Sequence, residues 1–150
     1  MPSDSLCRIK ISNREFFHSG FATAKPPTCM ASLGLENNEL PDSSITASSR
    51  YSETYRASHG RLYQKGSWLA NINGVEQWFQ VDFVNRTKVT GVAIQGFAYR
   101  YWLDWVTKFK LAYSYDGEFF IDYREDDDNA KVCYIWSFDK LRIMWKQGFP

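Results

Sequence analysis

The segment EQWFQVDF constrains the fold most, because its side chains alternate with the two-residue period of a β-strand. Phe79, Val81 and Phe83 lie on one face of this strand. Trp78, Gln80 and Asp82 lie on the other face. A strand with one solvated face carries polar residues on that face, so a large aromatic beside Gln and Asp is unexpected there. What covers this second face decides the kind of fold to which the chain belongs.

Further segments have the β-branched, aromatic and alternating character of strands. They cover residues 45–47, 77–84, 88–96, 106–114 and 119–123. The last two flank the sequence YDGE, in which Asp-Gly is a strong hairpin signal. No segment keeps a helical period over three turns. The sequence therefore predicts an all-β fold, and a two-sheet sandwich is the arrangement that fits such a set of short strands.

Length and charge restrict the class further. A chain of 150 residues has the size of one domain, and its 44% hydrophobic residues can fill one core. The 18 basic and 17 acidic residues leave a net charge of +1. Such a chain has no long-range field to attract nucleic acid, so we expect no nucleic-acid partner. No apolar run reaches the roughly 18 residues of a membrane helix.

The N-terminal segment and the cysteines give few positive signals. Residues 1–28 are polar and irregular and end in KPP, which predicts a weakly ordered leader. This leader has no apolar segment of the kind found in secretory signals, so the start taken alone indicates the cytosol. The three cysteines, Cys7, Cys29 and Cys133, form no C-x-x-C pair, so a zinc site is not indicated.

Signals of catalysis are missing from the sequence. It contains two histidines, His18 and His59, and none of the common hydrolase, metalloprotease or phosphate-loop motifs. We interpret His59, beside Gly60, as a solvated loop residue. The acidic run REDDDN (124–129) lacks the spaced oxygen ligands and the turn glycine of a calcium loop, so it too is interpreted as a solvated loop. The sequence predicts neither an enzyme nor a metal or other cofactor.

Five motifs then occur in an order and spacing that point to a family. They are LGLENNELPDSSITASS (33–49), GRLY (60–63), QWFQVDF (77–83), VTGVAIQG (89–96) and WVTKFKLAYSYDGEFF (105–120). Together they resemble the discoidin domain, also called the coagulation factor V/VIII type C domain, over residues 29–132. The resemblance implies a β-sandwich of the jelly-roll, galactose-binding-like kind, followed here by a divergent tail at residues 133–150.

The resemblance also suggests what covers the second face of the strand at 77–83. In the family the aromatic of this strand is packed within the two-sheet structure, which makes Trp78 a core residue. Asp82 then needs a buried polar partner, such as a loop hydroxyl or an Arg, because an unpaired buried carboxylate is very costly. By the same resemblance, Gln95 and Trp105 belong to the scaffold.

Members of the family are binding modules of secreted and cell-surface proteins, and they bind through loops called spikes at one end of the sandwich. By position, the first spike here is residues 48–59, and a later one is residues 96–105. The resemblance implies that ligand-binding residues lie in these loops, namely Arg50, Tyr51, Tyr55, Phe97, Tyr99, Arg100, Tyr101 and Trp102. Aromatic residues and Arg are enriched at binding surfaces. The alternative is that the loop aromatics only cap the end of the sheet.

The expected ligands follow from the family and from the composition of the spikes. Family members bind phosphatidylserine membranes, collagen, glycans or protein partners. The first spike offers Tyr, which prefers the membrane interface to the hydrocarbon, and a net charge of +1 adds little steering. We therefore expect weak binding to anionic membranes and a cell-surface or matrix protein or glycan as the main partner.

The C-terminal part departs from the family pattern. The family usually closes with a disulfide between a Cys near its start and one at its very end. Cys29 matches the first, whereas the second is missing, which leaves Cys133 as a candidate partner. The tail also lacks several of the family's closing strands. A truncated or divergent domain with an incomplete sandwich is expected from this pattern.

Alternatives stay open for the location of the protein and for its function. The sequon NRT makes Asn85 a glycosylation candidate in a turn between two strands, which fits an extracellular or cell-surface protein. The same sandwich also serves as a carbohydrate-binding module attached to enzymes, in which case aromatics would form a flat platform on a sheet face. A third hypothesis is a non-functional fragment, which would not unfold cooperatively.

Overall fold

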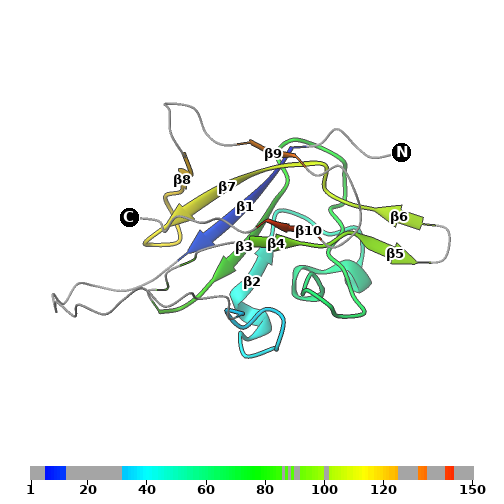
Figure 1. Ribbon diagram of the computed structural model, residues 1–150, viewed down its shortest axis with the longest axis horizontal. Coiled ribbons are helices and arrows are strands. Elements are labelled where there is room, and N and C mark those ends of the chain that lie inside the picture. The colour runs from blue at the N-terminus through cyan, green and yellow to red at the C-terminus, as the bar shows by residue number, and fades with distance from the viewer. Residues whose placement is uncertain are drawn as a thin grey trace, which may run out of the picture.

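The computed structural model describes residues 6–12, 32–85, 87, 89, 92–99, 102–124, 132–134 and 141–143. Within them the chain is built from short β-strands and three single-turn 3-10 helices, η1 (Asp42–Ser44), η2 (Glu53–Tyr55) and η3 (Ala57–His59) (Figure 1). The predicted all-β class is confirmed. None of the helices found in these residues is long and apolar enough to cross a membrane.

The main sheet has six strands. Five of them follow one another in space as β2 (Ile45–Ala47), β3 (Trp78–Asp82), β1 (Leu6–Ser12), β7 (Lys108–Ser114) and β8 (Ile121–Asp122). The sixth strand, β9 (Val132–Tyr134), also pairs with β7. Two smaller sheets pair β4 (Val92–Ile94) with β10 (Leu141–Ile143) and β5 (Phe97–Tyr99) with β6 (Trp102–Asp104).

Strand β1 sets the geometry of the main sheet, because it runs parallel to both of its neighbours. Ser12, at its end, pairs with Asp82 of β3 on one side and with Ser114 of β7 on the other. Strands β3 and β7 therefore start at one end of the sheet and finish together at the other. The residues immediately before β3 and β7 therefore lie near the first end, and those immediately after them lie near the second.

The position of β1 was not anticipated by the sequence analysis, which placed residues 1–28 in a weakly ordered leader. The strand occupies Leu6–Ser12, between β3 and β7. The sequence LCRIKIS does alternate, since Cys7, Ile9 and Ile11 share one strand face. The remainder of that leader, including Cys29, lies outside the described residues.

The core lies between the main sheet and its covering layers. One cluster joins Val89 and Leu111, and Val92 of β4 packs against it, so β4 contributes to the core beside β7. A second cluster consists of Leu40, Ile45 and Val81, against which half-buried hydrophobic side chains pack, among them Leu35, Phe79 and Phe83. Phe79, Val81 and Phe83, which share one face of the 77–84 strand, therefore all belong to this part of the core.

A buried arginine holds the loop that precedes β2. The guanidinium of Arg61 donates hydrogen bonds to the backbone carbonyls of Leu35 (3.3 Å) and Leu40 (2.8 Å) and to the carboxylate of Asp42 (2.7 Å). The hydrogen bond and the charge of Arg61 lower the pKa of the Asp42 carboxyl. These bonds close the loop of residues 33–42 over the second core cluster.

Candidate functional site

Both predicted spikes lie at the same end of the main sheet, which we call the spike end. Strand β2 is antiparallel to β3, with Ala47 opposite Phe79, so the first spike (48–59) leaves the sheet beside the start of β3. The second spike (96–105) contains the β5–β6 hairpin and leads into the start of β7 at Lys108. Figure 1 shows this hairpin projecting from the right-hand end of the molecule, with η2 and η3 near it.

A row of aromatic rings joins the two spikes. The ring of Tyr51 packs edge-on against Tyr55 at a centroid distance of 6.2 Å, and Tyr55 packs edge-on against Phe97 at 6.1 Å. Edge-to-face pairs at such distances are favourable beyond their area burial. Tyr51 ends this row with 63% of its surface exposed, so the row runs from the second spike out to solvent.

The backbone of the first spike is fixed by a polar network at its base. The hydroxyls of Ser48 and Ser49 both donate to the side-chain oxygen of Gln77, at 2.8 and 2.5 Å. The indole N–H of Trp68 donates to the carbonyl of Ser49 at 2.8 Å, and the N–H of Tyr51 donates to the carbonyl of Leu69 at 2.8 Å. The loop that carries Tyr51 is therefore held on two sides.

Gln77 and Trp68 are functional supports that the sequence analysis did not identify. Gln77 was seen only as the first residue of a strand, and Trp68 stood in a segment without a recognised motif. No local pattern reveals that their side chains meet Ser48 and Ser49, because the partners are 19 to 29 residues away in the chain.

Charged side chains on the first spike are paired with each other. Arg50 forms an ion pair with Glu53. The Nε–H of Arg56 donates to Nε2 of His59 at 3.0 Å, and Nδ1 of His59 lies 2.6 Å from the carbonyl of Thr54. This arrangement fits the neutral imidazole with its proton on Nδ1, donating to Thr54. His59 is thus a partly exposed loop residue whose ring is held by Arg56 and Thr54.

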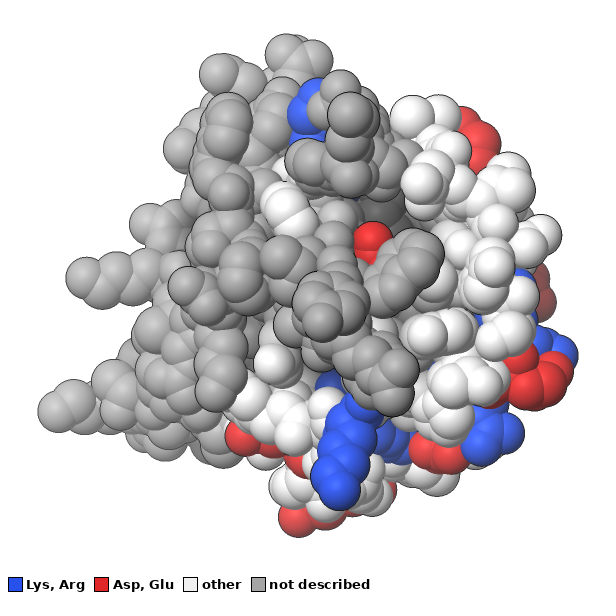
Figure 2. Space-filling model, turned by 90° about the vertical axis from the view of Figure 1, so that its right-hand side faces the viewer, with Lys and Arg blue, Asp and Glu red and all other residues white. Residues whose placement is uncertain are grey.

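The described surface at this end shows no segregation of charge. Lysine and arginine side chains alternate with aspartate and glutamate side chains along the lower and right-hand parts of the view in Figure 2, and other residues occupy much of the space between them. A mixed surface of this kind fits the net charge of +1. It offers contacts to polar ligands and does not act as a strong electrostatic attractor.

The second spike is described mainly through its backbone. Tyr99 and Trp102 are paired across the β5–β6 hairpin, whereas Arg100 and Tyr101, which connect the two strands, lie outside the described residues. Phe97, at the base of the hairpin, is half-buried. Of the predicted ligand-binding residues, those that the structure describes lie at the spike end, namely Arg50, Tyr51, Tyr55 and Phe97 together with the backbone of Tyr99 and Trp102. Direct side-chain contact between the spikes is made through Tyr55 and Phe97.

The residues that the resemblance assigned to the scaffold differ in burial and in hydrogen bonding. Trp78 and Trp105 are both half-buried. The carboxylate of Asp82, also half-buried, accepts the N–H of Val84 at 2.9 Å. Gln95 is exposed and accepts the N–H of Tyr63 at 3.0 Å.

Tyr63 is a further candidate that the sequence analysis missed. Its φ of +58° lies in the left-handed region, which a bulky residue rarely adopts. The ring is 44% exposed, and the hydrogen bond from Tyr63 to Gln95 places it beside the residue that precedes the second spike. Strained residues of this kind gather at functional sites, where the surrounding structure holds them in place. The sequence GRLY gives no signal of this conformation.

The described residues give no support for a metal site. Among them, no group of three or more His, Cys, Asp or Glu side chains is placed to hold a metal ion. The acidic run at 124–129 lies outside the described residues except for Arg124, so the interpretation of that run as a solvated loop stays a prediction.

The fold and the site together define a class of protein. It is an all-β domain that presents two contacting loops at one end of its main sheet, which is the architecture of a loop-based binding module. Comparison with known proteins then gives the family: residues 44–142 match the model of the F5/8 type C domain. The chain belongs to this family, the discoidin domains, whose fold is a β-sandwich.

Individual relatives agree with the family assignment. The chain is 38% identical to lactadherin of Rattus norvegicus over 69% of its own length and 26% of the relative's. It is 32% identical to the human EGF-like repeat and discoidin I-like domain-containing protein 3, over 74% of the chain and 25% of the relative. It is also 35% identical to human coagulation factor VIII, over 60% of the chain and 4% of the relative. The chain thus spans about a quarter of the first two proteins and a much smaller part of the third.

Proposed function

We propose that this domain is an extracellular adhesion or recognition module that binds a cell-surface or matrix protein or glycan through its spike end. The aromatic row Tyr51–Tyr55–Phe97 carries this proposal, because it joins both spikes and exposes its outer ring on a braced loop. A rigid aromatic anchor loses little conformational entropy on binding, which favours affinity. The family and its relatives, one of which is a coagulation factor, support an extracellular setting.

Eight residues are proposed to contact the ligand. Arg50, Tyr51 and Tyr55 belong to the first spike, and Phe97, Tyr99, Arg100, Tyr101 and Trp102 belong to the second. Tyr63 joins this set because it is exposed beside Gln95. Of these, Tyr51 is the strongest anchor candidate, since it is the exposed end of the aromatic row.

Tyr115 supplies a matched control for the anchor. Tyr51 and Tyr115 are both more than half exposed, and each packs edge-on against another tyrosine at about the same distance, 6.2 Å to Tyr55 and 6.0 Å to Tyr113. Tyr115, however, follows β7 and therefore lies at the end opposite the spikes.

The test compares wild type, Tyr51→Ala and Tyr115→Ala in binding to fibrillar collagen, to a panel of immobilised glycans and to phosphatidylserine vesicles. Losing an aromatic anchor should weaken binding about tenfold or more, whereas Tyr115→Ala should bind like wild type. Equal losses in both variants, or a loss with Tyr115→Ala alone, would show that the spike end is not the binding surface.

A membrane surface is the weaker candidate ligand. Arg50 on the first spike is already paired with Glu53, which reduces its value for anionic head groups. We therefore expect weak co-sedimentation with phosphatidylserine vesicles at physiological salt. Tight binding that both Trp102→Ala and Arg100→Ala abolish would instead make this a membrane-binding domain.

The second candidate function, a carbohydrate-binding module attached to an enzyme, requires a flat aromatic platform on a sheet face. The strongly exposed aromatic side chains in the described part of the chain are Tyr51, Tyr63, Tyr115 and Phe119, and all four lie in loops or turns. Their placement favours recognition by the ends of the sandwich. Asn85, exposed in the turn after β3, is proposed as a glycosylation site in this setting.

A further inference from the structure

The end of the sheet opposite the spikes exposes apolar side chains. In the turn between β7 and β8, Phe119 is 77% exposed, and its neighbours Tyr115 and Ile121 are both more than half exposed. Val84, in the turn after β3, is more than half exposed as well. We call these four residues the hairpin patch. Apolar side chains exposed at one end of a sheet are a candidate site for a cover or a partner, because burying them removes apolar surface from water.

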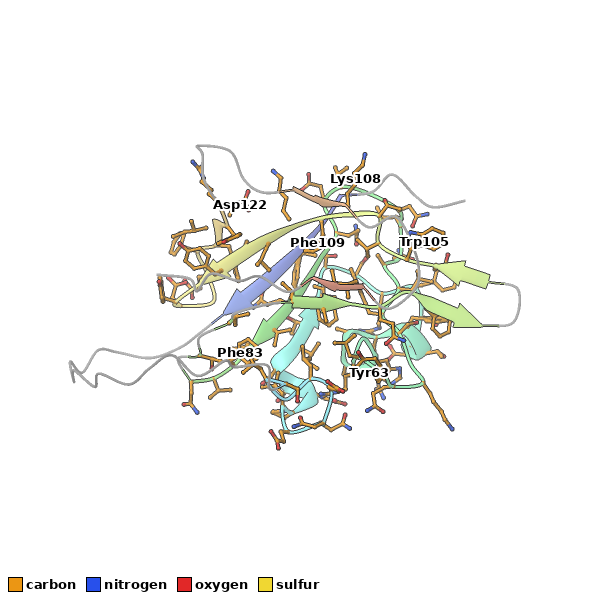
Figure 3. The ribbon with its side chains drawn as sticks, in the orientation of Figure 1. Tyr63, Phe83, Trp105, Lys108, Phe109 and Asp122 are labelled. Carbon is orange, nitrogen blue, oxygen red and sulfur yellow. The ribbon has the colours of Figure 1, made fainter. Side chains whose placement is uncertain are left out.

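The two turns of the hairpin patch lie at the same end of the sheet, on either side of the end of β1. Because Ser12 of β1 pairs with both Asp82 and Ser114, strands β3 and β7 finish level with each other. They are separated by two strand spacings, or about 10 Å. Figure 3 shows Phe83, just beyond β3, on the same side of the molecule as the turn that follows β7.

The turn that presents Phe119 is rigid. The carboxylate of Asp116 accepts the N–H groups of Glu118 (2.8 Å) and Phe119 (2.9 Å) and the hydroxyl of Ser114 (2.8 Å). Ser114 accepts the N–H of Gly117 at 2.9 Å, and Gly117 takes a φ of +79° that glycine adopts easily. These hydrogen bonds therefore hold the part of the hairpin patch that contains Phe119.

The sequon lies beside this patch. Asn85 is exposed and directly follows Val84, at the same level of the sheet as the hairpin. The turn is tight, since the N–H of Asn85 donates to the carbonyl of Phe83 at 2.5 Å and Val84 takes a φ of +61°. A side chain at this place can carry a bulky N-linked glycan whose inner sugars reach across about 10 Å to the hairpin.

We propose that an N-linked glycan on Asn85 lies over the hairpin patch and shields it from water and from other molecules. The C–H faces of sugar rings are apolar, so packing them on Phe119 and Tyr115 removes apolar area from water on both partners. This inference rests on the proposed extracellular function, because glycan attachment requires the secretory route. It leaves the spike end open, since the glycan lies at the opposite end.

A control variant can carry an N-linked glycan of the same kind at a different site. Asn71 is exposed, and its backbone N–H donates to the hydroxyl of Ser49 at 3.1 Å, at the base of the first spike. Replacing Asn73 by Thr creates the sequon Asn71-Ile72-Thr. The double variant Asn85→Gln/Asn73→Thr therefore moves the glycan to the spike end without changing its size.

The experiment uses full-length chain secreted by mammalian cells behind a cleavable leader, with glycan occupancy measured by mass spectrometry. Apolar exposure is then measured with the dye anilinonaphthalene sulfonate. We expect low dye fluorescence for glycosylated wild type and higher fluorescence for Asn85→Gln and for the glycan-relocated double variant. Folded wild type whose glycan has been removed enzymatically should match Asn85→Gln, which excludes a folding defect. Adding Phe119→Ser to Asn85→Gln should restore low fluorescence.

Several results would overturn the proposal. If Asn85 carries no glycan, the proposal loses its basis. A glycan on Asn71 in the relocated variant would then show that the cells are able to glycosylate this chain. Low fluorescence in the relocated variant would mean that any glycan suffices. An increase that persists with Phe119→Ser would place the exposed surface elsewhere. None of these results bears on spike binding, which the Tyr51 and Tyr115 variants test separately.

Discussion

The side chain of Arg61 holds the loop of residues 33–42 in place through several hydrogen bonds. Its side chain is 6% exposed and serves the carbonyls of Leu35 and Leu40 together with the carboxylate of Asp42. A planar guanidinium presents five N–H donors in a fixed fork, whereas a lysine ammonium has three on a flexible stem. The loop of residues 33–42 therefore depends on the geometry of this group as well as on its charge.

Replacing Arg61 should destabilise the domain. In Arg61→Met the buried carbonyls lose their donors, and each unsatisfied group costs about 1–3 kcal/mol, so we expect a loss of about 2–4 kcal/mol in the free energy of unfolding. Urea denaturation measures this loss. The control Asp42→Asn removes the charge of an exposed partner and keeps the bonds from Arg61 to the backbone, so its loss should be much smaller. Equal losses would show that the ion pair, not the carbonyl bonds, is what matters.

Asp116 acts at the same scale in the turn after β7. Its hydrogen bonds from the N–H groups of Phe119 and Glu118, followed by the hydroxyl of Ser114, lower the pKa of its carboxyl. A carboxyl with a lowered pKa in the folded state stabilises that state above its unfolded pKa, near 3.9. The contribution is lost as the pH falls through the folded value.

The turn should therefore open in acid. Between pH 7 and pH 5 we expect the amide hydrogens of Glu118 and Phe119 to stay protected from exchange, once intrinsic exchange rates are corrected for. Below pH 4 the protection should fall. Asp116→Asn, which keeps one acceptor oxygen but cannot ionise, should show no such pH dependence. A pH-dependent loss that is identical in Asp116→Asn would assign the effect to another group.

Among the elements, β1 has the largest structural effect for its length. Its seven residues form parallel ladders with β3 and β7 simultaneously, so within the described residues it is the strand that hydrogen-bonds these two strands into one sheet. A single strand placed between two others also fixes the register that brings both spikes to one end.

Disrupting β1 should loosen the whole sheet. A proline at Ile9, which pairs with Phe79 and with Leu111, cannot donate to either ladder and is not tolerated in a central strand. The lost hydrogen bond costs about 1 kcal/mol, and the displaced backbone adds to it. Ile9→Pro should lower the melting temperature by several degrees in calorimetry, whereas Ile9→Val should change it little. An unchanged melting temperature in Ile9→Pro would contradict a central β1.

The elements also show how far the sequence alone could lead. Strands β3 and β7 could be predicted because Val81, Phe109 and Leu111 are buried at the two-residue period. The hairpin between β7 and β8 followed from Asp-Gly. Strand β1 alternates equally well, yet its place depends on an open position between β3 and β7, which no local pattern expresses. The contacts of Gln77 with Ser48 and Ser49, and of Tyr55 with Phe97, are tertiary for the same reason.

At the scale of the whole molecule, a disulfide could join the N-terminal region to the main sheet. Cys133 lies in β9 opposite Phe109, whereas Cys29, its proposed partner, lies outside the described residues. A bridge between them would close a loop of about a hundred residues, worth up to about 4–5 kcal/mol in the chain-entropy model. Cys29 should be a free thiol unless Cys133 or Cys7 pairs with it, and peptide mapping without reduction would then find Cys29 joined to that cysteine. Thiol labelling of both cysteines in secreted protein would disprove the pairing.

At the same scale, two ends of one sandwich are proposed to have separate roles. The spike end carries the aromatic row and the braced first spike, and the opposite end carries Asn85 and the hairpin patch. This division follows from the parallel arrangement of β3, β1 and β7, which separates the loops before these strands from the turns after them.

Hydrogen-exchange footprinting of the domain, bound to whichever of collagen, glycan or vesicle retains it, tests the central claim most directly. We expect binding to slow amide exchange in both spikes, residues 48–59 and 96–105, while the turns at 83–85 and 115–120 exchange as in the free protein. Slowed exchange confined to those two turns, or to the strands of the main sheet, would contradict recognition through the spike end.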